Sequence, residues 1–93
     1  MNLGETAPKK SLIVYPSAFP VKVMGANGEG FTEAIVAIAR NFDPAFDAAT
    51  IESRPSKAGN YLGLTITVTA TSREQLDELY RTLSNHPMVK VVL

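Results

Sequence analysis

The most constraining feature of this chain is a strict alternation over Leu62–Ala70, where every second residue is apolar and the residues between include three threonines. Because neighbouring side chains of a β-strand point to opposite faces, such a segment buries one face and exposes the other. We therefore expect a strand in the middle of a sheet that has one covered face and one open face.

Two amphipathic helices are predicted to cover that sheet. The first spans about Phe31–Asn41 and ends at Asp43-Pro44, since apolar residues recur there at spacings of three and four. Thr71 or Ser72 begins the second helix with a capping signal, and Asn85–Pro87 ends it. The apolar residues at helical spacing are Phe31, Ile35, Ile38 and Phe42 in the first helix and Leu76, Leu79, Tyr80 and Leu83 in the second.

Three shorter segments predict the remaining strands, at Phe19–Met24, Ile51–Ser56 and Met88–Leu93. The element order is then β-α-β-β-α-β, and right-handed crossovers around one hairpin give the sheet order 4-1-3-2. The predicted fold is α+β, a ferredoxin-like sandwich with a four-stranded antiparallel sheet and both helices on one face. Two charges and a proline suit Ile51–Ser56 to the outermost position. The strand residues expected beneath the helices are Val21, Val23, Leu64, Ile66, Val68, Val89 and Val91.

The 93 residues suffice for one domain with a single two-layer core. Residues 1–15 are predicted to be a flexible N-terminal leader and arm, and residues 16–93 the folded domain. Pro16 and Pro20 interrupt the apolar stretch Leu12–Pro20, so this stretch is expected to lie as an extended arm outside the hydrogen-bonded sheet.

Composition narrows the classes of function. Nine basic residues balance nine acidic ones, which argues against nucleic acid and anionic membranes as partners. The chain has no cysteine, which excludes disulfides, thiolate metal sites and thiol nucleophiles. No apolar run is long enough for a signal peptide or a membrane span, so a cytoplasmic location is expected.

Three segments and the threonine-rich strand resemble, in order and spacing, the YbeD-like bacterial family of unknown function. These segments are Phe19–Gly25, Ser56–Tyr61 and Val89–Leu93. The resemblance covers about Pro16–Leu93, and its most specific pieces are Lys22–Gly25 and Gly59–Tyr61 ahead of Thr65–Thr71. It implies a small cytoplasmic protein similar to ACT regulatory modules, which bind amino acids and switch metabolic enzymes. No catalytic domain is expected beside it, so regulation would act on a separate partner.

The glycine-rich loop between the first strand and the first helix is one candidate ligand site. Free N–H groups and the helix dipole favour an anion there. ACT modules bind their amino acids at this loop, so the resemblance implies the same place for a ligand here. The candidate ligand-binding residues are Gly25, Asn27, Gly28 and Gly30. The alternative is that these glycines only form a tight turn, because their spacing is not that of a dinucleotide-binding loop.

The open face of the sheet is a second candidate site, either as a homodimer surface anchored by Met24 or as a solvated face. The predicted interface residues are Lys22, Met24, Thr65, Thr67, Lys90 and Val92. The last strand offers another route to association. Val89–Leu93 carries one charge and no proline, so a second chain or the Leu12–Tyr15 segment could pair with it.

No catalytic or metal-binding constellation is predicted. An acylphosphatase shares the element order, but Gly30–Thr32 ends the loop without the arginine that would hold phosphate. The lone His86 lies in a turn without an acidic or nucleophilic partner, and no histidine pair or acidic cluster has metal-ligand spacing. An RNA-recognition module would need aromatic residues where Lys22, Met24 and the threonines are expected.

We therefore expect no enzyme, no metal and no cofactor. The predicted function is that of a small ACT-like regulatory protein that binds a metabolic enzyme or a small ligand such as an amino acid. One alternative is a protein–protein adaptor that uses the sheet face or the edge strand. An acylphosphatase-like hydrolase is the least favoured alternative.

Overall fold

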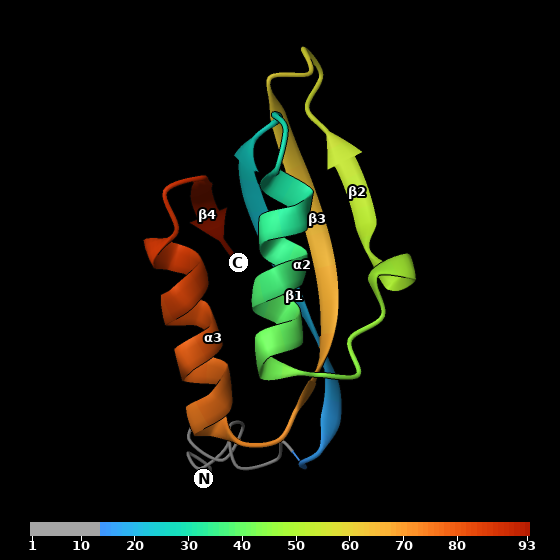
Figure 1. The fold of residues 1–93 in the computed structure, drawn as a ribbon, viewed down its shortest axis with the longest axis vertical. Helices are drawn as coiled ribbons and strands as arrows, with labels where there is room; N and C mark the ends of the chain where they lie inside the picture. The colour runs from blue at the N-terminus through green and yellow to red at the C-terminus, as the bar shows by residue number, and fades with distance from the viewer. Residues whose placement is uncertain (1–13) are drawn as a thin grey trace, which may run out of the picture.

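The structure is a computed structural model that describes residues 14–93, so most of the predicted leader lies outside the described residues. Its elements follow the predicted order, with one short 3-10 helix added after the first helix (Figure 1). In chain order they are β1 (Ser17–Ala26), α2 (Phe31–Phe42), η2 (Ala48–Thr50), β2 (Glu52–Pro55), β3 (Tyr61–Ala70), α3 (Arg73–Asn85) and β4 (Val89–Val92).

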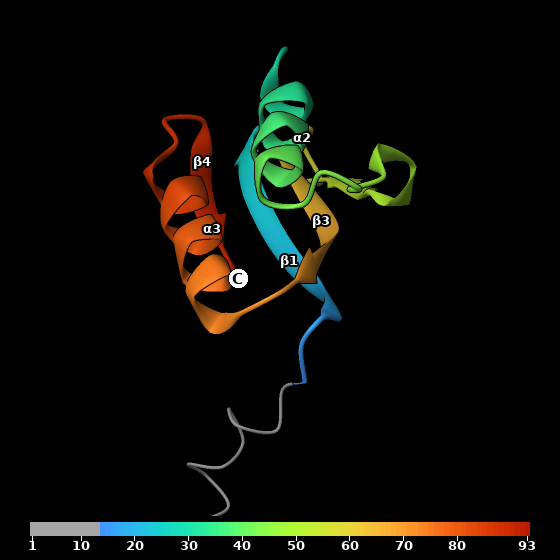
Figure 2. The ribbon, with the colours of Figure 1, turned by 60° about the horizontal axis from the view of Figure 1, so that its bottom comes forward.

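The four strands form one sheet in the order β2-β3-β1-β4, and every neighbouring pair is antiparallel. This arrangement confirms the predicted order 4-1-3-2 and the α+β, ferredoxin-like class. Figures 1 and 2 show α2 and α3 on the same side of the sheet, which leaves the other side open. β2 forms one edge, as predicted, and all four of its residues are exposed.

The core lies between the helices and the two central strands. In β3 the predicted alternation is confirmed, because Leu64, Ile66 and Val68 are buried while Thr67 and Thr69 are exposed. Full burial of an aliphatic or aromatic side chain of this size contributes about 1.5–3 kcal/mol. The largest fully buried side chains are Val21, Val23, Phe31, Ile35, Leu64, Ile66, Val68, Leu79 and Leu83.

The first strand begins earlier than predicted. Ser17 pairs with Ala70 and Pro20 with Thr67, so the expectation that Leu12–Pro20 lies outside the sheet is wrong for its last four residues. Two residues after Pro20, the N–H and C=O of Lys22 both bond to Leu93, on the β4 side of β1. Because backbone groups alternate in direction along a strand, the nitrogen of Pro20 also points to the β4 side, beyond the end of β4. The missing N–H therefore removes no bond to β3.

The last strand carries a shift of register that reverses two predicted orientations. Val92 pairs with Val23 and Val91 with Met24, but the next pair is Gly25 with Val89, so Lys90 has no partner in β1. One extra residue in a strand exchanges the faces of the side chains beyond it. Val92 therefore packs against the core, and Val91 lies on the open face with 44% of its surface exposed. The predictions that Val91 lies under the helices and Val92 on the open face are both wrong.

Candidate functional site

The glycine-rich loop is occupied by contacts within the fold. A Cβ atom on Gly25 would lie 2.2 Å from the carbonyl oxygen of Met88 and 2.6 Å from the ring of Phe31, so this glycine is required by packing. Gly30 precedes α2 with φ at +87°, a conformation that glycine adopts without strain. Both residues thus have a structural reason to be glycine.

Asn27 ties this loop to the turn between β2 and β3. Its backbone N–H donates to the carbonyl of Asn60 at 2.9 Å, and its side-chain Nδ2 donates to the carbonyl of Gly59 at 3.0 Å. The carbonyl of Gly28 accepts from the N–H of Phe31. Gly25 thus lies buried in β1, the other three candidate ligand residues lie in the loop that follows, and Asn27 already has two partners within the protein. Ligand binding by this loop stays a prediction.

The open face is built from two rows of side chains that run across the sheet. Paired residues in neighbouring strands lie on the same face, so the pairs between strands show which residues belong to each row. The first row contains Glu52, Thr65, Lys22 and Leu93. The second row contains Arg54, Gly63, Met24 and Val91.

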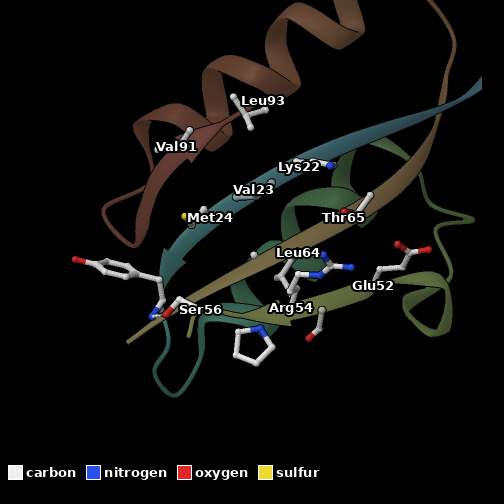
Figure 3. A pocket seen from close by; sticks show the side chains of 14 residues that line it. Lys22, Val23, Met24, Glu52, Arg54, Ser56, Leu64, Thr65, Val91 and Leu93 are labelled. Atoms are coloured by element: carbon white, nitrogen blue, oxygen red, sulfur yellow. Dashed lines mark hydrogen bonds between the residues drawn. The ribbon is translucent and has the colours of Figure 1, made fainter. Parts of the chain in front are cut away.

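These rows line a groove of about 510 Å³, which we call the open-face groove. Its volume lies in the range of roughly 300–1,000 Å³ that is typical of ligand pockets. Figure 3 shows Lys22, Met24, Thr65, Arg54 and Glu52 along it, and Val91 and Leu93 at its β4 end. The apolar side chains in its lining that are largely exposed are Met24, Tyr61, Val91 and Leu93.

The charged residues of the groove are Lys22, Glu52 and Arg54. Within residues 14–93 the one ion pair joins Arg81 to Glu78 on α3, so neither cation of the groove has a carboxylate within 4 Å there. The groove thus offers two cations and one anion to an occupant. Such exposed charges give direction and selectivity to binding more than they give affinity.

Four of the six predicted interface residues lie on the open face as expected, namely Lys22, Met24, Thr65 and Thr67. Thr67 lies next to Pro20 outside the groove, and Lys90 lies at the register shift. Arg54 and Gly63 were not predicted, because the place of Gly63 beside Met24 depends on the β1–β3 register and that of Arg54 beside Gly63 on the β2–β3 register. A hairpin centred on Lys57–Gly59 is the signal that would have aligned Arg54 with Gly63.

The other side chains that could take part in acid–base or metal chemistry lie away from the groove. The Nδ1 atom of His86 accepts from the N–H of Met88 at 3.1 Å, and His86 caps the end of α3. Burial raises the pKa of the Tyr80 hydroxyl above its ordinary value of 10.0, but Tyr80 lies on α3, away from the groove. In the part of the chain that is described, no three histidines or acidic residues gather as metal ligands. None of the helices described there has the length and apolar character to span a bilayer.

The chain matches a family model described as protein of unknown function (DUF493) over residues 10–93. It is 74% identical to a UPF0250 protein of Leptothrix cholodnii over 85 residues, which are 91% of this chain and 93% of the relative. It is 60% identical to a UPF0250 protein of Bordetella parapertussis over 86 residues, 92% of this chain and 94% of that relative.

Among solved structures, protein HP0495 from H. pylori matches with a TM-score of 0.72 at 16% identity. The match covers 87% of this chain and 85% of HP0495. At this identity the likeness concerns the fold alone, and it agrees with the ferredoxin-like arrangement described above. The sequence matches identify the family, and they confirm the resemblance to the YbeD-like family. This chain belongs to the DUF493 family, the YbeD-like family of bacterial UPF0250 proteins of unknown function.

Proposed function

We propose that this protein is a small, non-catalytic binding protein that docks on a partner protein through its open-face groove. The observation that carries the proposal is the distribution of exposed apolar side chains. Of the five large hydrophobic residues that are most exposed among residues 14–93, four line this groove. Apolar side chains gathered on one surface and rimmed by polar residues are typical of interaction sites.

The regular pairing of the sheet and the side chains on it support a protein as the occupant. The groove is floored by β1 and β3, which pair over ten residues each without a shift of register. Met24 is flexible and polarisable, a property that suits an apolar anchor for a partner side chain. Tyr61 adds an aromatic ring of the kind that is enriched in protein interfaces.

The charges of the groove suggest the chemistry of the partner. The groove carries two positive charges, on Lys22 and Arg54, and one negative charge, on Glu52. A partner surface with an apolar side chain beside an acidic residue would complement them. The similarity to ACT modules that the sequence resemblance implies makes metabolic enzymes the first partners to test, with regulation as the role that such docking would serve. An amino acid in the Gly25–Gly30 loop is less well supported, since Asn27 is already bonded within the fold.

The test compares capture of bacterial proteins by the full chain and by three variants. Met24→Glu and Val91→Glu place a charge in the groove, and Ala37→Glu places the same charge on an exposed position of α2. Captured proteins are identified by mass spectrometry, and each purified candidate is titrated against the four chains by calorimetry. We expect a partner that binds the unsubstituted chain and Ala37→Glu equally and binds both groove variants at least tenfold more weakly.

Equal binding of every captured protein to the groove variants and the control would refute the proposal. Self-association that is lost in Met24→Glu and Val91→Glu, measured by light scattering, would identify a second copy as the occupant and would also refute it. Thermal unfolding of each variant shows whether the fold is retained, because a charge on an exposed strand position is expected to leave Tm within a few degrees.

A further inference from the structure

The fold does not explain why residue 63 is a glycine. Its φ is not positive, and the β1–β3 and β2–β3 registers run through Gly63 without a shift. A Cβ atom built on Gly63 would meet the carbonyl oxygen of Arg54 at 3.6 Å and the terminal methyl of Met24 at 3.9 Å, which are ordinary contacts. Gly25, by contrast, leaves no room for a Cβ.

A glycine inside a strand is unfavourable, because it loses more conformational freedom on folding and offers no side chain for packing. Where its own strand has no bulge or bend, such a glycine often marks the close approach of a ligand or another chain. Gly63 lies in the lining of the open-face groove. The missing side chain therefore marks the point where an occupant approaches the sheet most closely.

Four side chains surround this point and form what we call the Gly63 hollow. Arg54 and Met24 flank it in the neighbouring strands, and Tyr61 and Thr65 flank it along β3. All four line the groove, and Figure 3 shows Arg54, Met24 and Thr65 around this part of the sheet. The hollow is thus bordered by the guanidinium of Arg54, the hydroxyl of Thr65, the thioether of Met24 and the aromatic ring of Tyr61.

This combination matches an acidic side chain. Arg54 and Thr65 can donate hydrogen bonds to a carboxylate, and guanidinium–carboxylate bonds are among the stronger ones because both partners are charged. Met24 and Tyr61 offer apolar contact for the methylene groups that carry the carboxylate. Lys22 adds a second positive charge in the neighbouring row. Glu52 lies at the β2 end of that row and has no cation within 4 Å among the described residues.

We infer that the Gly63 hollow receives the carboxylate of an aspartate or glutamate of the bound partner, with Arg54 as its counter-ion. The inference rests on the proposed function, since it names the part of the partner that the groove would recognise. It adds the requirement that the partner places a negative charge at the Gly63 hollow. Docking through Met24 and Val91 alone does not require such a charge.

The test uses random dodecapeptides displayed on phage, selected against the immobilised full chain. The same selection is run on Arg54→Glu, on Gly63→Val, which fills the hollow, and on Met24→Glu. Arg73→Glu is the matched control, because it makes the same change of charge at an exposed position on α3. A valine is well suited to a strand, so Gly63→Val is expected to fold, and a melting curve of each variant verifies this.

We expect peptides from the unsubstituted chain and from Arg73→Glu to be enriched in aspartate or glutamate next to an apolar residue. Arg54→Glu should change that position to lysine or arginine, and selected acidic peptides should bind Arg54→Glu and Gly63→Val at least tenfold more weakly. Peptides that depend on Met24 but show no acidic enrichment, or keep it in Arg54→Glu, would refute the hollow and leave the docking face intact. Peptides that bind Met24→Glu and the unsubstituted chain equally would instead refute the proposed function.

Discussion

The carboxylate of Asp43 accepts a hydrogen bond from the backbone N–H of Thr69 at 2.9 Å, across 26 positions of the chain. Its other oxygen accepts from the N–H of Ala45 at 3.1 Å, and the residue is 8% exposed. One side chain thus joins the end of α2 to the end of β3.

Replacing Asp43 by alanine should therefore cost about 1–3 kcal/mol of the free energy of unfolding, since two partly buried N–H groups lose their acceptors. Urea denaturation measures the change. Asp47→Ala is the control, because Asp47 caps the exposed η2 helix through the N–H of Ala49 and should cost only about 0.5–1 kcal/mol. Equal losses in the two variants would show that the Asp43–Thr69 bond adds little.

Gly25 and Gly63 are expected to respond to alanine in opposite directions. Gly25→Ala forces the Met88 carbonyl and the Phe31 ring apart and should destabilise the protein by about 1–3 kcal/mol. Gly63→Ala meets only ordinary contacts and restricts the unfolded chain, so it should stabilise the protein by about 0.4–1 kcal/mol. Denaturation curves of both variants test this, and a loss of stability in Gly63→Ala would mean that the fold itself needs this glycine.

Gln75 connects three elements through both ends of its amide. Its Oε1 accepts from the N–H of Thr71, and its Nε2 donates to the carbonyls of Phe42 at 2.9 Å and Thr69 at 3.3 Å. A glutamate keeps the acceptor but cannot donate, so Gln75→Glu should lower the free energy of unfolding by about 1–3 kcal/mol. Glu74→Gln, an exposed change next to it, should leave Tm nearly unchanged. Comparable shifts of Tm in both variants would contradict the role assigned to Nε2.

Tyr80 should make the protein less stable in strong base. Burial raises the pKa of its hydroxyl in the folded state, so the unfolded chain loses this proton first as the pH rises past its ordinary value of 10.0. The stabilising contribution is therefore complete below pH 10 and is lost as the pH rises through the folded pKa. In Tyr80→Phe the decline of Tm above pH 10 should be shallower than in the unsubstituted chain. Parallel declines would show that another group is responsible.

The parts of the fold that follow from local patterns could be predicted from the sequence. The alternation in β3 and the spacing of Leu76, Leu79 and Leu83 each place buried side chains without knowledge of the rest of the chain. With the elements known, the handedness of the crossovers decides the order of the strands. Phe46 was missed, because it reaches the core from an irregular segment that has no periodicity.

The features that depend on pairing between distant residues were predicted less well. Whether Pro20 can lie in a strand depends on where β4 ends beside it, and no local signal gives that position. The orientations of Val91 and Val92 depend on the shift at Lys90, which nothing in Val89–Leu93 announces. The same limit applies to the candidate site, where Met24 was predicted but Gly63 beside it and Arg54 beside Gly63 emerge only from the registers of the three strands.

The unpaired Lys90 means that the exposed surface of β4 is determined by the position of one register shift as much as by residue types. If Lys90 paired with Met24 and the shift were absent, Val91 would pair with Val23 and turn inward, and the side chain of Val92 would turn outward. A relative with the same valines but a regular last strand would therefore present a different binding surface, although its composition is unaltered.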